Sequence, residues 1–399
     1  MQITDKLIQL ASGVGHPAFD KTAGAELVFE PLDEALAVSL YRSSWMARAI
    51  VDEPAHDMTR AWRSWQGDAA MVSKLERAEQ ALRLQAKVHN AVQLARLTGR
   101  AAIYVGTEAG PGDEPSQPLS NMIRPGAIRY LHVFKGSDLR GEDREQDLGH
   151  PNFGGYRAYA FHGSPAYNRQ KGPKSQSGQI DQTTSPVLIH HSRLIWFRGA
   201  TDPLDLTGGQ SVLQSCYQPI LDAEVLLAHV KALIGEAKLD VIKVRDLASL
   251  LSTEAGITRL QKRYTEGMAL KSILGVTLID SGSEEWERKQ MNFAHLPELV
   301  QQRLDLVAAA ARMPVTRLLG QSLGGLNATG ESDIRNYYDM ISGRQETGLR
   351  AALRALDRLL LAHADMTEDA MDYVWNPLYQ LDEVSAADAA LKRAQAAAL

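Results

Sequence analysis

The stretch that decides the fold is MPVTRLLGQSLGGLNATGESDIRNYYD, residues 313–339. Four glycines lie between residues 320 and 330, and no lysine or arginine occurs between residues 318 and 334. Apolar residues recur at helical spacing on both sides, over residues 296–312 and 331–361. Because glycine takes a positive φ at little steric cost, the stretch predicts an uncharged, mobile loop between two helices.

Upstream of this stretch, two helical segments precede a set of strands. Apolar spacings of three and four predict helices over 32–63 and 69–97, with Pro54 ending or bending the first. Gly99 is the predicted C-cap before a buried strand at 101–105. Composition then predicts a loop at 106–125, a polar mobile segment at 165–185, and strands at 128–134, 156–161, 187–189 and 194–197.

The second half of the chain alternates between long helices and short strands. We expect helices over 211–238 and 247–268, and strands at 241–244 and 275–279. The alanine-rich tail, residues 385–399, also has a helical pattern. Helices and strands mixed in this way predict an α+β fold.

Length and composition limit the classes of function. A chain of 399 residues is long enough for two or three domains. Lys and Arg total 43 against 48 Asp and Glu, for a net charge of −5, and a protein that grips DNA through its phosphates is normally basic. Cys216 is the single cysteine, so no intrachain disulfide forms, and we expect a buried thiol in a reducing compartment. No membrane-spanning run or signal peptide is evident, which predicts a soluble intracellular protein.

One candidate catalytic motif lies in the decisive stretch itself. Gly320-Gln-Ser322-Leu-Gly324 matches the G-x-S-x-G nucleophile elbow, which would make Ser322 the nucleophile of a serine hydrolase. That geometry needs a strand before the serine, whereas the pattern before Ser322 is helical and contains Pro314. The alternative interpretation is a flexible turn.

A second candidate is a pair of H-x-S triplets, one starting at His162 and one at His190. Two such histidines on facing strands would act as base and acid on one phosphodiester. The triplet is common, and a polar segment separates the two. No His, Cys, Asp or Glu cluster has the spacing of a zinc site. The motifs alone therefore predict no enzyme, metal or cofactor, with phosphodiesterase or hydrolase as the alternatives.

The stretch 313–339 resembles the signature of a family of tailed-bacteriophage portal proteins, which is otherwise a domain of unknown function in phage structural modules. Further similar segments occur in the same order, at 41–51 with 57–60, 95–103, 192–197 and 275–285. The resemblance covers roughly residues 35–360, and it departs from the pattern at Leu323, where the family has proline. Some members carry a fused phosphodiesterase that degrades cyclic nucleotide signals, but the spacing of the two triplets here does not resemble that module.

The resemblance implies a phage portal fold and a ring, typically a homododecamer, at one vertex of the capsid. Double-stranded DNA would pass through it during packaging and ejection. The implied partners are the terminase large subunit, a head-completion or adaptor protein, and the major capsid and scaffold proteins. The implied locations are the virion and, during assembly, the host cytoplasm. The implied regions are a wing (1–209), stem helix 1 (210–237), a clip (238–293), stem helix 2 (294–317), a channel loop (318–331), and a channel helix with crown (332–399).

Two sets of site residues follow from these assignments. In the channel loop, small uncharged side chains would touch moving DNA without holding it; these are Gln321, Ser322, Gly324, Gly325, Asn327 and Thr329. In the clip, an acidic cluster would dock the terminase and the adaptor; it consists of Glu284, Glu285 and Glu287. A ring also requires contact between different surface patches, so apolar residues on 211–237 should be exposed in a single subunit.

Overall fold

The protein is described from a computed structural model that places residues 30–107, 114–119, 124–150, 152–162, 186–203, 208–235, 238–244, 251–274, 284–290, 295–320, 329–367 and 371–379. Two compact units form: Met1–Cys216 together with Thr316–Leu399, and Tyr217–Val315. Helices and antiparallel sheets are mixed, which confirms the predicted α+β class. The segments predicted at 165–185, 275–279 and 385–399 lie outside the described residues.

Each of the two long helical segments predicted near the N-terminus is divided into two helices. The first becomes α2 (Glu34–Ser43) and α3 (Trp45–Arg60), separated at Ser44, whose backbone is extended. The second becomes α4 (Ala69–Leu82) and α5 (Leu84–Thr98), separated at Arg83, which adopts the left-handed conformation with φ 51°. Neither break contains glycine or proline, so the sequence pattern does not reveal them.

Pro54 was predicted to end or bend the first helix; it lies inside α3, which continues to Arg60, so it does not end the helix. Proline has no N–H, which leaves the Ile50 carbonyl, four residues earlier, without its helical donor. Arg96 of α5 donates from Nη2 to this Ile50 oxygen at 2.6 Å, and from Nε to the Val51 oxygen at 3.0 Å. A side chain therefore replaces the backbone donor and keeps α3 helical.

Gly99 ends α5 at a φ of 93°, which confirms the predicted C-cap. A Cβ at this position would collide with the backbone oxygen of Gly209, so both conformation and space require glycine. The chain turns there into β2 (Arg100–Thr107), the central strand of the first sheet, and its residues 101–106 are all buried. The predicted strand at 101–105 is therefore confirmed and is slightly longer than predicted.

Two three-stranded antiparallel sheets stack on each other. The first has the order β3-β2-β7, with β3 at Ile128–Lys135 and β7 at Leu194–Arg198. The second has the order β4-β5-β6, with strands at Leu139–Arg144, Tyr156–Phe161 and Val187–His190. A shared cluster lies between them, formed by Ala102, Tyr104, Leu139, Tyr159, Ile189 and Leu194. Of these strands, only the polar β4 was not predicted.

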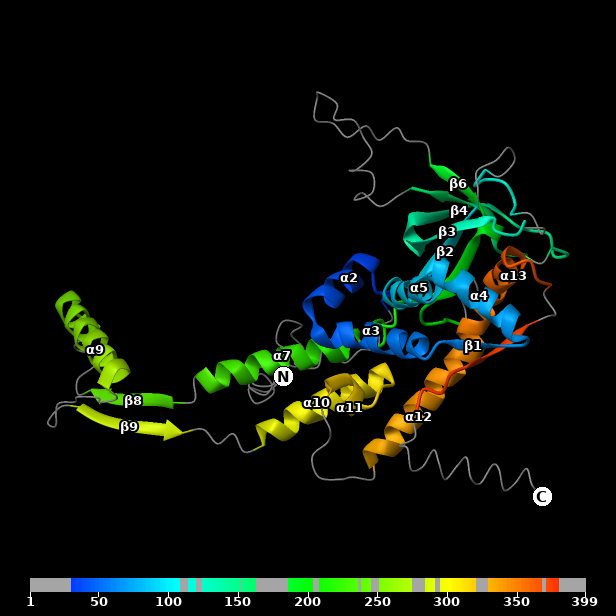
Figure 1. Cartoon of the computed structure of the whole chain (residues 1–399). Coiled ribbons are helices and arrows are strands. Elements are labelled where there is room, and N and C mark those ends of the chain that lie inside the picture. Colours follow the sequence, from blue (N-terminus) through cyan, green and yellow to red (C-terminus); the bar gives the residue numbers. More distant parts are fainter. Residues whose placement is uncertain are drawn as a thin grey trace, which may run out of the picture. The chain divides into compact units, whose positions relative to one another are not determined.

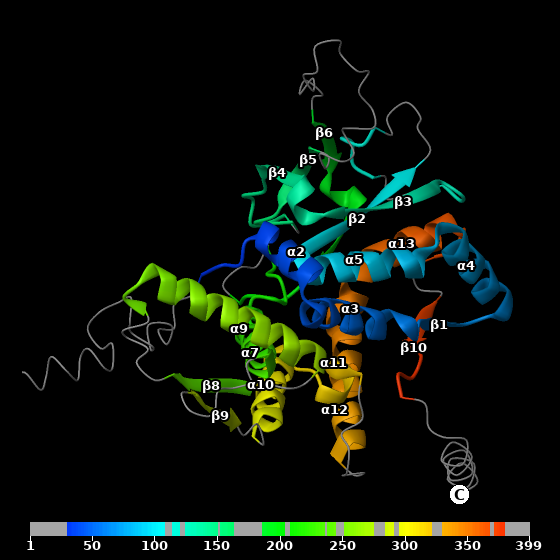
Figure 2. The same ribbon diagram turned by 90° about the vertical axis from the view of Figure 1, so that its left-hand side faces the viewer.

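Helices cover the other face of the first sheet. Helix α5 contacts all three of its strands, and α13 (Arg350–His363) contacts β7. Figure 1 shows the second sheet above the first and α5 below it, and Figure 2 shows α13 on the same side as α5. Helix α12 (Thr329–Arg344) passes into α13 through a π-helical turn at Gln345–Leu349.

Residues from near both ends of the chain meet in a short ladder. Strand β1 (Arg63–Gln66) pairs with β10 (Asp372–Trp375), and Arg63 faces Trp375. Both strands have only four residues, and neither was predicted. Their pairing brings the C-terminal part of the first unit onto its N-terminal helices.

The second unit contains α7 (Tyr217–Gly235), β8 (Lys238–Val244), α9 (Glu254–Leu274), β9 (Glu284–Gln290) and α10 (Leu296–Ala311). Helices α7 and α10 contact each other, and β8 pairs with β9 antiparallel. Strand β9 was not predicted from its charged sequence. Among the described helices, none is both long and apolar enough to cross a membrane.

Candidate functional site: a buried anchor beside residues 321–328

The structure describes only part of the two predicted sets of site residues. Residues 321–328 of the predicted channel loop lie outside the described residues. This range contains all but one of the predicted loop residues, namely Gln321, Ser322, Gly324, Gly325 and Asn327. Thr329 is the first residue of α12. Glu284, Glu285 and Glu287 lie on β9, with Val244, Lys243 and Val241 as their partners on β8. The roles assigned to both sets remain predictions.

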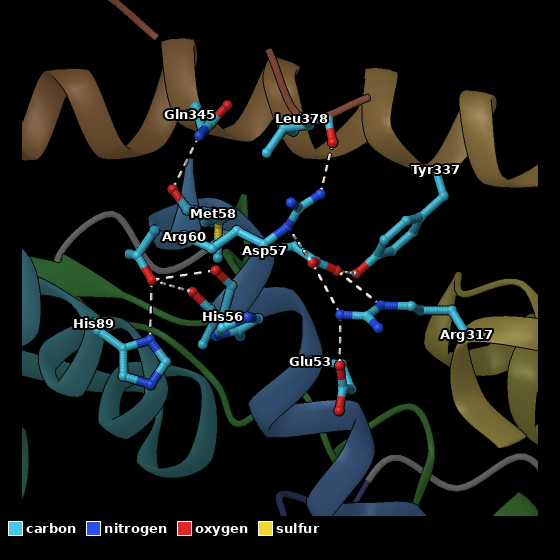
Figure 3. Close-up of polar contacts among 12 residues, drawn as sticks. Glu53, His56, Asp57, Met58, Arg60, His89, Arg317, Tyr337, Gln345 and Leu378 are labelled. Atoms are coloured by element: carbon cyan, nitrogen blue, oxygen red, sulfur yellow. Dashed lines mark hydrogen bonds and ion pairs between the residues drawn. The ribbon is translucent and has the colours of Figure 1, made fainter. Parts of the chain in front are cut away.

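The residues that flank 321–328 are described, and they meet at one carboxylate. Arg317 lies on the short helix α11 (Val315–Leu319), before the segment, and Tyr337 lies on α12, after it. Both side chains bind Asp57 of α3, as Figure 3 shows. Arg317 donates from Nε to Oδ2 at 3.0 Å and from Nη2 to Oδ1 at 2.9 Å, while the Tyr337 hydroxyl donates to Oδ2 at 3.0 Å.

Asp57 has no exposed surface, so its charge depends on protein partners. Arg60, three residues later on α3, supplies a further donor, with Nε 3.0 Å from Oδ1. Glu53 binds the same Arg317 guanidinium at 2.6 Å, so two carboxylates face two guanidinium groups. A buried carboxylate is favourable only when its oxygens are bonded in this way, and bidentate arginine is the strongest such partner.

The pKa shifts support this pattern of donors and acceptors. Burial alone would lower the pKa of Arg317, but the bonds to Asp57 and the charge of Glu53 raise it. Burial, together with the charge and hydrogen bond of Asp57, raises the pKa of Tyr337 far above its ordinary value. Both groups therefore stay protonated and continue to donate to Asp57 across the physiological range.

Helix α3 also holds neighbouring parts of the chain. Arg60 Nη2 donates to the Leu378 carbonyl at 2.6 Å, and its guanidinium lies over the Tyr338 ring, 5.3 Å from the centroid. Buried Gln345, in the π-helical turn, donates to the Met58 carbonyl at 2.9 Å. We call Asp57, Glu53, Arg317 and Tyr337 the loop anchor, because they join the two flanks of residues 321–328 to α3.

The histidines near the loop anchor do not form a metal site. The Thr59 hydroxyl is 2.9 Å from His89 Nδ1, and the rings of His56 and His89 meet edge to face. Within the described part of the chain, no group of three His, Cys, Asp or Glu side chains has metal-binding geometry. Cys216 is buried, as predicted, and burial raises the pKa of its thiol.

The histidines of the two H-x-S triplets, the alternative catalytic pair, lie at opposite ends of the β5–β6 ladder. His190 pairs with Ala158, whereas His162 comes directly after Phe161, which pairs with Val187. At about 3.4 Å per residue, the two positions are roughly 14 Å apart along the sheet. The His190 Nδ1 atom is 2.9 Å from the Ser192 hydroxyl, which accepts from the Leu119 N–H. His190 therefore helps to hold a turn, and the register does not bring the two imidazoles together.

None of the loop-anchor residues was singled out from the sequence, although all but Glu53 lie in segments quoted for the family resemblance. Asp57 begins the 57–60 segment, and Arg317 and Tyr337 lie within 313–339. A partial signal was present: Asp57 lies at helical spacing from Ile50 and Pro54, on the apolar face of the predicted helix, and an aspartate buried there needs a cationic partner. Spacing along the chain does not identify that partner, because Arg317 is 260 residues away.

Comparison with known proteins places this fold in a family. The model of the phage portal protein family matches residues 36–399. The chain therefore belongs to the phage portal protein family, which confirms the resemblance found in its sequence.

Two curated relatives and one solved structure illustrate the likeness. An "Anti-CBASS protein Acb1" of Caulobacter sp. (strain RHG1) is 37% identical over 96% of this chain and 61% of that protein, so the chain spans about three-fifths of its length. An uncharacterized protein of Haemophilus influenzae is 30% identical over 90% of this chain and 77% of that protein. A chain in the neck of a native gene transfer agent particle, computed with C12 symmetry, has a TM-score of 0.54 at 16% identity, covering 98% and 93% of the two chains. At this identity the likeness shows the fold alone.

Proposed function

We propose that this protein assembles into a portal ring at one capsid vertex and serves as the conduit for DNA packaging and ejection. The observation that carries the proposal is membership of the phage portal family over residues 36–399. The structural likeness to a chain in a neck with C12 symmetry supports a ring of twelve subunits. The terminase large subunit, a head-completion or adaptor protein, and the major capsid and scaffold proteins are the proposed partners, in the host cytoplasm and then in the virion.

Exposed apolar side chains on the second unit support assembly. Val225 of α7 and Leu299 and Leu306 of α10 are each about half exposed, although the two helices pack on each other. The exposed residue on α7 agrees with the sequence expectation for 211–237. A heterologous contact between neighbouring subunits would remove such side chains from water.

Single-particle imaging tests the ring directly. We expect negative-stain images of the purified full chain to show rings with a central hole, and mass photometry to give about twelve subunit masses. Val225→Glu combined with Leu306→Glu should weaken assembly, while the control Lys231→Glu, at an exposed position on a different face of the same helix α7, should assemble normally. Monomers over a wide range of concentration and salt would overturn the proposal.

In the proposed ring, the predicted channel loop (318–331) faces DNA, and the acidic cluster on β9 docks the terminase. The net charge of −5 favours weak contact with phosphates, because each neutralised phosphate adds affinity through counterion release. Asn327→Arg should therefore slow DNA movement by adding a cation. Replacing Glu284, Glu285 and Glu287 by Gln should weaken terminase docking and leave the ring intact.

We also propose that the role is structural and not enzymatic. The names of two curated relatives concern anti-CBASS activity, but this chain spans about three-fifths of their length, and that activity is not assigned to it. Ser322→Ala and His190→Ala should leave packaging nearly unchanged. Loss of packaging by Ser322→Ala with an intact ring would favour the catalytic alternative.

A further inference from the structure

Arg317 and Tyr337 converge on a single buried atom from two sides of the predicted channel loop. Both donate to Oδ2 of Asp57 at 3.0 Å, so their donor atoms are no more than about 6 Å apart. The segment from Arg317 to Tyr337 therefore begins and ends at the same carboxylate of α3. The partners are 260 and 280 residues from Asp57 in sequence, so only the tertiary fold creates this junction.

We propose that Asp57 is the positioning residue of the predicted channel loop: its carboxylate binds Arg317 and Tyr337 together and sets the points at which the loop leaves and rejoins the fold. This inference rests on the proposed function only for the loop's contact with DNA. Its structural part, the fixing of both flanks on α3, concerns described residues alone.

The hydrogen-bond geometry of the junction favours a rigid contact. Arg317 binds both carboxylate oxygens, so that its orientation as well as its distance is fixed. Asp57 has no exposed surface, so water does not reach its carboxylate oxygens. The two flanking helices, α11 and α12, are therefore held on α3 by one carboxylate.

A purely stabilising role makes a different prediction. A buried polar group that only supports packing should lower the unfolding free energy without changing the flanks of the loop in particular. Thr59 provides the matched control, because it lies on α3, is buried, and bonds His89 and the Ala55 carbonyl without touching Arg317 or Tyr337. Thr59→Val and Tyr337→Phe each remove one buried hydroxyl.

Hydrogen–deuterium exchange on the full chain tests the inference. In Tyr337→Phe and Asp57→Asn, we expect amide exchange in residues 315–319 and 329–337 to rise at least about fivefold, which corresponds to a loss of about 1 kcal/mol of local protection. Thr59→Val should leave exchange in these flanks within about twofold of wild type. Arg317→Lys keeps the charge but loses the bidentate geometry, so it should fall between wild type and Arg317→Gln.

The exchange results either support or overturn the positioning role of Asp57. Unchanged exchange at both flanks in Tyr337→Phe would overturn the inference, even if Asp57→Asn fails to fold. Equal increases in Thr59→Val would also overturn it, because they would show a general loss of stability. If exchange rises as expected and assembled rings of Tyr337→Phe package DNA more slowly, both the anchor and the loop's role are supported. If exchange rises but packaging is normal, the anchor stands and the proposed function of the loop fails.

Discussion

Two buried charged clusters in the first unit differ in sign. The loop anchor is centred on an anion, Asp57, whereas a second cluster is centred on a cation, Arg63 of β1. Both side chains have no exposed surface. The first joins segments that flank the predicted channel loop, and the second closes the β1–β10 ladder that brings residues near the C-terminus back onto the fold.

Carboxylates and aromatic rings surround Arg63. Glu79 of α4 accepts from its Nε at 2.9 Å and its Nη2 at 2.6 Å, and Asp357 of α13 lies 2.6 Å from Nη1. The guanidinium lies 4.4 Å from the ring centroids of both Trp65 and Tyr373. Cation–π contacts and ion pairs therefore act together in one dry site.

The two clusters differ in net charge, and this difference determines how the stability of each depends on substitution and on pH. In the loop anchor, Asp57 and Glu53 face Arg317, and the neighbouring Arg60 also pairs with Asp57, so the charges cancel. Around Arg63, two carboxylates face a single buried guanidinium. The balanced cluster suits a fixed contact, while the surplus negative charge makes the other cluster sensitive to the loss of its cation and to pH.

The largest expected effect is the removal of that cation. Arg63→Met should lower the unfolding free energy by about 4 kcal/mol, because it leaves Glu79 and Asp357 buried without their partner. Denaturant titration followed by tryptophan fluorescence measures the change. The control is Arg350→Met: Arg350 lies 4.1 Å from the centroid of the same Tyr373 ring but is partly exposed, so it should cost only about 1 kcal/mol. Equal costs would contradict the importance of burial.

The pH dependence of stability sharpens the comparison. Burial, opposed by Arg63 and reinforced by Glu79, raises the pKa of Asp357 from 3.8 to about 6. The folded protein therefore takes up this proton at a higher pH than the unfolded chain, and between about pH 6 and pH 4 the folded state binds more protons. Stability contributed by this group rises as the pH falls through that window, by up to about 3 kcal/mol.

Asp357→Asn should remove this part of the pH dependence. Urea titrations at several pH values between 4 and 7, on wild type and variant, isolate the contribution of the single carboxyl group. The difference in unfolding free energy between the two proteins should change by about 2–3 kcal/mol across the window. A difference that stays constant with pH would show that Asp357 does not titrate there.

A third buried charge, Arg96, tests what a cation contributes when its bonds go to backbone carbonyls. Burial lowers its pKa to about 10, and it donates to the Ile50 oxygen that Pro54 leaves without a helical partner. We expect a double-mutant cycle of Arg96→Met and Pro54→Ala to give a coupling of about 1–2 kcal/mol, because alanine restores the backbone donor. Additive effects would mean that Arg96 does not act through this carbonyl.

The smallest expected effects distinguish a tyrosine that acts through its hydroxyl group from one that acts through its ring. Tyr337 contributes to the loop anchor through its hydroxyl, so Tyr337→Phe should cost about 1–2 kcal/mol. Tyr373 contributes through its ring, which contacts the guanidinium groups of Arg63 and Arg350, so Tyr373→Phe should cost less than about 0.5 kcal/mol. Thermal unfolding of the two variants side by side measures the difference, and the reverse order would contradict the assigned roles.

Local patterns in the sequence predicted many of the elements. The helix that ends at Gly99 and the strand that follows it were both readable, because a positive-φ glycine and a buried apolar run are local signals. The four-residue strands β1 and β10 were not, since their pairing depends on a partner about 310 residues away. The charged strand β9 was missed for the same reason: its ladder with β8, and not its composition, makes it a strand.

By itself, the sequence determined the α+β class, the membership of the portal family and the positions of most helices, because periodicity and family motifs are properties of neighbouring residues. Only the tertiary structure decided that α3 runs through Pro54, because the replacing donor comes from Arg96 on another helix. The tertiary structure also decided that Asp57 binds both Arg317 and Tyr337, since folding brings these distant partners to it. A buried charge is stable only where distant groups converge on it, and that convergence is not encoded in any local pattern.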